Sequence, residues 1–372
     1  MLYQSFSSQK GAPPLNSNKY VGMDVHTATI SVAVRDVAGK LIMESVIETK
    51  ASTILQFIQG LRGNLYVTFE EGTWAAWLYD LIKPYVTNVV VCNPRRNALL
   101  KEGSRCDRID ARKLADLLRT NLLRPVYHGE KGLRTLKELA RAYLTVSKDL
   151  TRVMNRVKAI YRGWGIPCGG QSVYHPRHRK EWLSKIAQVS VRRRAELYYE
   201  QLDALVLLRK KARQELLAEG KKHQAWKLLR SIPALGPIRA AVLMAIVQTP
   251  HRFRTKRVLW KYSGFGVRTH TSADHRYVKG QLERSKKPVS VRGLDRDHNH
   301  QLKDLFKGAA IQASTREGPF REFYEALVAK GMRPEMARLT LARKIAVIAL
   351  TVWKKGGAFD AKYLKPQTAL CL

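Results

Sequence analysis

The sequence predicts an α/β domain with a mixed sheet, followed by a long helical arm and a mainly helical C-terminal domain. Three observations support this prediction. Short runs rich in Val, Ile and Thr, separated by turn residues, fill residues 20–49 and indicate a strand meander. Helical and apolar strand segments then alternate up to residue 127, which is typical of α/β domains. Beyond that point the apolar residues recur at the helical period.

The α/β domain is expected to span residues 20–127. After the meander, the expected elements in chain order are a helix at 52–61, a strand at 65–69, a helix at 74–82, a strand at 89–92 and a helix at 109–118. The strands are apolar enough to be buried, and the turn at Ala38-Gly39 separates two strands of the meander. A meander that continues into helix–strand alternation predicts a mixed sheet.

The arm is expected over residues 128–229. Its two long amphipathic stretches, 133–164 and 191–229, are separated by a segment rich in Pro and Gly, so we expect two antiparallel helices joined by a loop. The C-terminal domain is expected over 230–360, mostly helical, with a polar interruption from Thr269 to Asn299. Residues 1–19 are interpreted as a disordered leader and residues 361–372 as a tail.

The charge balance predicts a nucleic-acid partner. The chain of 372 residues has 67 Lys and Arg against 30 Asp and Glu, a net charge of +37. Such an excess repels itself in the folded state unless a polyanion neutralises it. The apolar stretch Ile345–Trp353 is too short to span a bilayer, so a membrane is not the expected polyanion.

The location is predicted from two absences in the sequence. Residues 1–20 lack the apolar core of a signal peptide, and the four cysteines have neither metal-site nor disulfide spacing. We therefore expect a cytoplasmic protein with reduced thiols, associated with a bacterial nucleoid.

Four carboxylates form the candidate metal site. Asp24 and Glu70 each stand at the end of an expected strand, where α/β sheets build their sites. Asp107 and Asp110 are three residues apart, so a helix places them on one face, where they repel each other unless a cation lies between them. Hard oxygen ligands suit Mg²⁺ or Mn²⁺. Two such ions can stabilise the attacking and leaving oxygens of a phosphodiester displacement.

Basic residues are interleaved with these acids. Some of them pair with acids on the helix surface, or they hold a phosphate backbone against the metal ions; the sequence allows both interpretations. The candidates for nucleic-acid binding in this segment are Arg95, Arg96, Lys101, Arg105 and Arg112.

The C-terminal half contains two further candidates. The turn Ile232–Gly236 is similar to a helix-hairpin-helix that presents backbone amides to a phosphate, or it is a simple packing element. Farther along, Ser272 lies among Thr, His and cations, including Arg268 and Arg276. A serine there is either a nucleophile toward phosphorus, with the cations stabilising the developing charge, or a phosphate-binding residue. Arg268 and Arg276 are also candidates for nucleic-acid binding.

Over residues 20–360 the sequence resembles the bridge-RNA-guided insertion-sequence transposases. The resemblance rests on an ordered set of motifs: GMDVH, FEEGTWAAWLYDL, NPRRNALLKEGSRCDRIDARKLAD, IPALGPIRAAVLMAIV, W-x-x-SGFG and MARLTLARKIAVIALTVWKKGGAFD. Each motif is weak alone, and their order is specific. The resemblance implies an RNase H-like, RuvC-like domain with four acids in DEDD positions, joined to a C-terminal domain with a catalytic serine.

Transferred residue by residue, the resemblance implies that Asp24, Glu70, Asp107 and Asp110 bind Mg²⁺ and that Ser272 is the nucleophile. It further implies strand exchange through a 5′-phosphoserine link to donor and target DNA. A structured bridge RNA would choose both DNA sites. Composite active sites would form in a homo-oligomer, from a dimer to a tetramer.

Two departures from the family pattern keep alternatives open. Ala273 follows the serine where the family commonly has glycine, and Arg105-Cys106 precede Asp107 where it commonly has Lys-Thr. Thr271 or Ser263 are the alternative nucleophiles, and Glu71 is the alternative to Glu70.

Two other functions remain possible. A structure-selective, RuvC-like DNA endonuclease needs the four acids but no serine. A nucleic-acid-binding protein with a degenerate nuclease fold needs neither.

Overall fold

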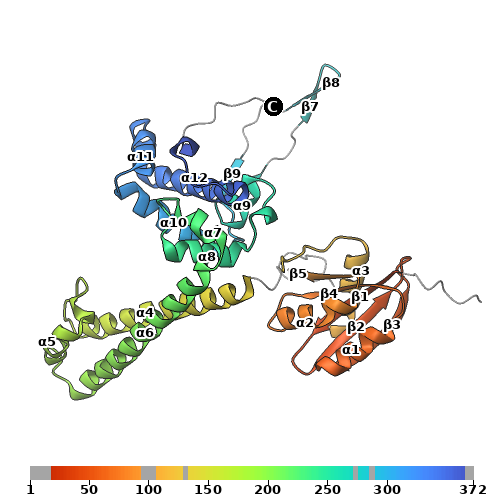
Figure 1. Cartoon of the computed structure of the whole chain (residues 1–372), viewed down its shortest axis with the longest axis horizontal. Coiled ribbons are helices and arrows are strands. Elements are labelled where there is room, and N and C mark those ends of the chain that lie inside the picture. The colour runs from red at the N-terminus through yellow and green to blue at the C-terminus, as the bar shows by residue number, and fades with distance from the viewer. Residues whose placement is uncertain (1–17, 94–105, 129–132, 271–274, 285–289, 365–372) are drawn as a thin grey trace, which may run out of the picture. The chain divides into compact units, whose positions relative to one another are not determined.

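The computed structural model describes residues 18–93, 106–128, 133–270, 275–284 and 290–364. The chain divides into two compact units, Met1–His128 and Gly129–Leu372 (Figure 1). Among the described residues, no helix combines the length and the apolar character needed to cross a bilayer.

The N-terminal unit is built on a five-stranded mixed sheet. Its strands are β1 (Asn18–Val25), β2 (Thr29–Arg35), β3 (Leu41–Glu48), β4 (Asn64–Glu70) and β5 (Asn88–Cys92), in the spatial order β3-β2-β1-β4-β5. The meander pairs β1 with β2 and β2 with β3 in antiparallel register, whereas β4 is parallel to both β1 and β5. The predicted mixed sheet is confirmed, and β1 begins two residues before the expected start of the domain.

Helices cover the two faces of this sheet. Helices α1 (Ala51–Gly60) and α2 (Ala75–Ile82) pack on one face, and the short, exposed η1 (Lys83–Tyr85) follows α2. Helix α3 (Asp107–Arg119) packs on β1, β2 and β4. Val21 and Met23 of β1 share a core with α1 and α2, and side chains alternate along a strand. Gly22 and Asp24 therefore point to the opposite face, which α3 covers.

A glycine in β1 allows α3 to lie close to the sheet. A Cβ atom built on Gly22 would lie 2.2 Å from the Ala111 carbonyl oxygen and 2.5 Å from the Ala115 amide nitrogen. Both obstacles are backbone atoms of α3, so they cannot rotate away as a side chain would. This close packing fixes the position of α3 along β1.

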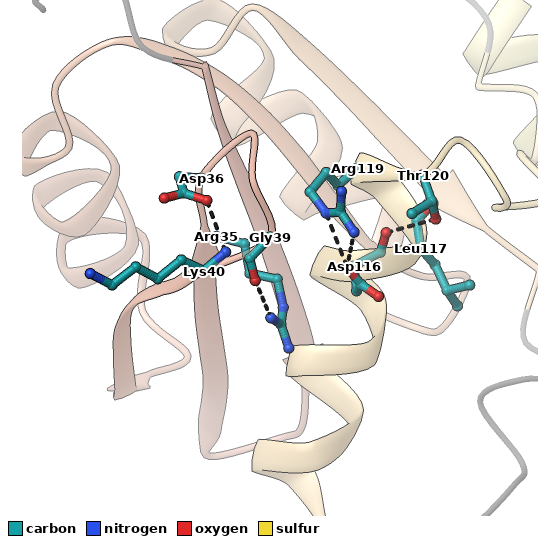
Figure 2. A network of polar contacts seen from close by, with 8 residues as sticks. All are labelled: Arg35, Asp36, Gly39, Lys40, Asp116, Leu117, Arg119 and Thr120. Carbon is teal, nitrogen blue, oxygen red and sulfur yellow. Dashed lines mark hydrogen bonds and ion pairs between the residues drawn. The ribbon is translucent and has the colours of Figure 1, made fainter.

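The C-terminal end of α3 contacts the turn between β2 and β3. Gly39 has a φ of +88°, and a Cβ there would lie 3.1 Å from the guanidinium carbon of Arg119. Asp36 accepts a hydrogen bond from the Lys40 amide in this turn, and Asp116 accepts two from Arg119 (Figure 2). The turn predicted at Ala38-Gly39 is confirmed.

The C-terminal unit begins with two long helices, α4 (Arg134–Gly163) and α6 (Val189–Lys221), which pack against each other along the predicted arm. Between them lie η4 (Ser172–Tyr174), η5 (Pro176–His178) and α5 (Arg179–Ser184). The buried hydroxyls of Tyr161 and Tyr199 lie 3.0 Å apart, and Tyr199 donates to the Val173 carbonyl. These contacts fasten the connecting segment to both helices.

The remainder of this unit is mainly helical, as predicted. Its helices are α7 (Gln224–Arg230), α8 (Pro237–Val247), η6 (Pro250–Arg252), α9 (Lys256–Tyr262), α10 (His300–Thr315), α11 (Pro319–Ala329), α12 (Pro334–Lys355) and η7 (Ala361–Leu364). Residues of α8, α10 and α12 form one buried core. Leu364 is also buried in it and Tyr363 packs against it, so the expected tail begins with a short helix that is attached to the core.

The polar interruption contains strands that were not predicted from the sequence. Strand β6 (Val267–His270) pairs with β9 (Ser290–Leu294), and β7 (His275–Val278) pairs with β8 (Gln281–Arg284). The β7–β8 turn is Lys279-Gly280, and both residues have positive φ, as a two-residue hairpin turn requires. The four-residue runs flanking Lys-Gly were the missed signal.

The turn from Ile232 to Gly236 buries Ile232, Ala234 and Leu235, whereas Pro233 and Gly236 are exposed. Ile232 and Leu235 are inaccessible to solvent or nearly so, and Ala234 is 4% exposed. The turn joins α7 to α8, and its apolar side chains enter the main core of the unit. These contacts favour the packing element over the phosphate-binding hairpin.

Candidate metal-binding active site

Three carboxylates meet where β1 ends and α3 begins. Asp24 is the penultimate residue of β1 and faces α3. Asp107 and Asp110 both lie in the first turn of α3. Because Gly22 contacts Ala111 and Ala115, the first turn of the helix is brought beside Asp24, two residues farther along the strand. Acidic groups in a first turn are also favoured by the helix dipole.

A histidine connects two of these carboxylates. His26 Nε2 lies 3.2 Å from Asp24 Oδ2, where the ring N–H donates a hydrogen bond, and 3.7 Å from Asp107 Oδ2. Among the residues that the structure describes, Asp24, His26 and Asp107 are the group whose ligand atoms all lie within 4.8 Å of one another. His26 was not among the residues predicted from the sequence, although it stands directly beyond the GMDV strand.

The electrostatics of the cluster favour a bound cation. Burial raises the pKa of Asp24 above its ordinary value, and the charges of Asp107 and Asp110 raise it further, against the lowering contact with His26. Asp110 Oδ1 is buried without a hydrogen bond from any described residue, and its cationic neighbour, Lys113 Nζ, is 3.8 Å away. A divalent cation would relieve both the repulsion and the unsatisfied oxygen.

Glu70 reaches the same edge of the sheet from the neighbouring strand. Met23 of β1 pairs with Phe69 of β4 in parallel register, so Glu70 occupies the position next to Asp24. Paired residues of parallel strands point to the same face, which places the Glu70 side chain on the α3 side. Glu70 does not belong to the group within 4.8 Å, so its role as a ligand stays a prediction.

Arg112, predicted to bind nucleic acid, is engaged within the N-terminal unit. Its guanidinium donates to both oxygens of Glu44 in β3, at 2.6 Å for the Nη2 contact. Arg108 also donates to Glu44, at 3.2 Å. These two arginines, Arg112 foremost, lower the pKa of Glu44 to about 2. The pairing attaches α3 to β3, and the phosphate contact of Arg112 stays a prediction.

Of the other predicted site residues, some lie within the described part of the chain and the rest lie outside it. Arg268 is exposed on β6, and the backbone of Arg276 lies in β7. Ser263, an alternative nucleophile, is fully buried and donates a 2.6 Å hydrogen bond to the Leu259 carbonyl, so its hydroxyl is not presented to DNA. The predictions outside the described residues are Arg95, Arg96, Lys101, Arg105, Thr271 and Ser272.

Comparison with known proteins supplies the family. A DEDD transposase model of the IS110 type matches residues 21–163, and a model described as the transposase IS116/IS110/IS902 family matches residues 226–325. The first match includes all four predicted acids, and the second includes Ser272. No curated protein matches the chain. The two matches together cover well over half of the sequence, and the chain belongs to the IS110 family of DNA transposases.

Proposed function

We propose that this transposase carries out Mg²⁺-dependent, RNA-guided strand exchange between donor and target DNA through a phosphoserine intermediate. The observation that carries the proposal is the cluster of Asp24, Asp107 and Asp110 at the junction of β1 and α3. A cluster of carboxylates binds a small cation. The net charge of +37 on the same chain attracts DNA to it.

The residues of the cluster fit a hard divalent cation. Asp24 and Asp107 would supply carboxylate oxygens, and the buried oxygen of Asp110 is a further donor. His26 would orient the Asp24 carboxylate through its hydrogen bond, because imidazole is a poor ligand for Mg²⁺. When bound there, Mg²⁺ supplies stabilisation of the negative charge that develops on the oxygens of the scissile phosphate.

The chemical step is assigned to Ser272. In the proposal its hydroxyl oxygen attacks the scissile phosphorus, a serine–phosphate bond forms, and the 3′-oxygen leaves and takes up a proton. A 3′-hydroxyl of the exchanged strand then attacks the phosphoserine, which restores the phosphodiester and the serine hydroxyl. The ester conserves the bond for rejoining, so strand exchange needs no nucleotide cofactor.

The partners follow from the same proposal. A structured bridge RNA pairs with both DNAs and supplies the sequence choice. The acidic site of one subunit works with the serine of another in a homo-oligomer. This division is supported by the two separate family matches, one around the acids and one around the serine.

A covalent-trapping experiment tests the mechanism. The full chain, expressed with the RNA encoded beside its gene, is incubated with DNA that carries a nick near the exchange point, so that rejoining is blocked. We expect a protein–DNA adduct that survives denaturation and maps to Ser272 by mass spectrometry. Ser272→Ala should abolish adduct and exchange, and Asp24→Asn should abolish both while DNA binding is kept.

Thr315→Ala is the matched control, because this hydroxyl donates only within α10. Cleavage that persists in Ser272→Ala would replace the serine mechanism with a RuvC-like endonuclease. Exchange that is independent of divalent metal would remove the metal site from the proposal.

A further inference from the structure

The C-terminal unit contains a cavity of about 650 Å³ that the proposed strand exchange does not use. Helices α9 and α12 form most of its wall, with contributions from α11 and η7. Its volume lies within the roughly 300–1,000 Å³ typical of small-molecule sites, so one nucleotide fits. All of its lining residues belong to one compact unit, and all are described.

The polar lining of the cavity is cationic. The charged residues are Lys256, Arg343, Lys344, Lys354 and Lys355, and none of the described lining residues is acidic. Arg343 and Lys354 already donate to the carbonyls of Phe265 and Phe253. Burial lowers the pKa of Lys344, and the neighbouring charge of Lys256 lowers it further. The structure therefore holds like charges together, and an anion would relieve their repulsion.

Aromatic rings alternate with these cations. Trp260, Phe323 and Tyr363 line the cavity and are only partly buried. The Trp260 indole donates a 3.1 Å hydrogen bond to the Arg343 carbonyl, which fixes its ring. Lys256 lies 5.9 Å from the centre of this ring, and Lys355 lies 6.0 Å from the centre of the Tyr363 ring. Each cation thus stands beside a stacking surface.

We propose that this cavity binds an unstacked nucleotide of a single-stranded nucleic acid, with its phosphate at Lys256 and Lys344 and its base against the aromatic rings. Cations along a backbone path together with aromatic stacking surfaces are the usual means of single-strand recognition. A duplex would first have to unpair and unstack a base, whereas a single strand offers one at a lower cost. An acidic peptide would match the cations and leave the rings unused. The inference rests on the proposed function, because strand exchange and guide pairing both expose single strands.

The first test measures binding in EDTA, so a failure of the metal chemistry does not affect it. The full-length protein is titrated with fluorescent single-stranded RNA, single-stranded DNA and duplex of one sequence, at salt high enough to weaken nonspecific binding. We expect the double variant Lys256→Gln/Lys344→Gln to bind the single strands about tenfold less tightly. The slope of log affinity against log salt should fall by about 0.7, the value for the one phosphate that the variant no longer neutralises.

The matched control is Lys330→Gln, an exposed lysine that follows α11 and does not line the cavity. Duplex binding should be the same in all proteins. Single-stranded RNA and single-stranded DNA are compared, and the one that loses more affinity in the double variant identifies the source of the nucleotide. Equal losses for duplex and single strand, or a loss no greater than that of Lys330→Gln, would overturn the proposal.

The second test finds the base directly. Single strands containing 5-iodouracil are photo-crosslinked to the full-length protein, and the modified peptides are identified by mass spectrometry. We expect adducts on Trp260 or Tyr363, and we expect Tyr363→Leu to remove the Tyr363 adduct without lowering the melting temperature by more than a few degrees. Crosslinks found only on residues outside the cavity would contradict the assignment. So would crosslinks within the cavity that a competing poly-glutamate peptide prevents and an unlabelled oligonucleotide does not.

Discussion

Helix α3 carries two groups of charges that differ in how they are satisfied. In one group, Arg108 and Arg112 meet Glu44, and the pairing holds the Glu44 pKa near 2. In the other group, Asp107 and Asp110 lie beside Asp24, whose pKa burial and these neighbours raise. The first group stabilises its own charges within the fold. The second is paired only in part, by His26 and Lys113, and keeps an excess of negative charge that a cation would neutralise.

The difference teaches how to separate structural charges from functional ones. All of these residues belong to α3 or to strands of the same sheet, so sequence position alone does not distinguish them. The extent of pairing does: Glu44 is paired with two arginines and joins elements of the fold, whereas the aspartates are paired only in part and prepare a binding site. Four predictions test this distinction.

The largest expected effect is on chemistry. Asp107→Asn should lower strand exchange by about 10³-fold, because loss of one carboxylate weakens the binding of the cation that stabilises the reacting phosphate. Arg112→Gln, one turn farther along α3, should keep exchange within a few-fold. Rates are compared with RNA and both DNAs saturating. A loss in Arg112→Gln equal to that in Asp107→Asn would mean that the paired group is also functional.

The next effect is on the contact that brings both groups to the sheet. Gly22→Ala should destabilise the N-terminal unit by about 3 kcal/mol, because its methyl group meets the backbone of α3. Gly60→Ala, where the added methyl group meets nothing within 4 Å, is the control and should change little. Denaturant unfolding measures both. An unchanged midpoint for Gly22→Ala would show that α3 does not pack this closely.

Metal binding should stabilise the wild-type protein and not a variant of the acidic group. Without metal at pH 7, the raised pKa of Asp24 means that its ionised form destabilises the fold, and this cost vanishes as the pH falls through that pKa. Asp24→Asn should therefore melt a few degrees higher than wild type in EDTA. Saturating Mg²⁺ should raise the wild-type melting temperature and leave the variant unchanged. Equal Mg²⁺ shifts in both proteins would contradict the site.

The smallest effect concerns the paired group and pH. The lowered pKa of Glu44 means that its pairing contributes stability above pH 4.5, its ordinary value, and loses it as the pH falls towards about 2. Glu44→Gln should melt slightly lower than wild type at pH 7, and the difference should shrink over that range. Thermal melting at a series of pH values measures it, with Glu138→Gln, an exposed pair within α4, as the control. If the difference in melting temperature between wild type and Glu44→Gln does not change with pH, the destabilisation does not come from the loss of the ion pair.

Much of the fold was predictable because it depends on local patterns. The meander, the buried strands and the amphipathic helices each have a period that reads directly from residues 20–164. The β7–β8 hairpin was missed because its strands are short and polar, and Lys279 is an unusual residue for positive φ.

The candidate site was predictable in part. The sequence alone determined the sheet class, the net charge and the placement of Asp24 and Glu70 at strand ends, because these follow from residue type and period. Only the tertiary structure decided that His26 joins Asp24 and Asp107 and that Arg112 pairs with Glu44. Those contacts join side chains from different elements. They depend on how α3 lies on the sheet, which the close packing at Gly22 fixes and which no local pattern encodes.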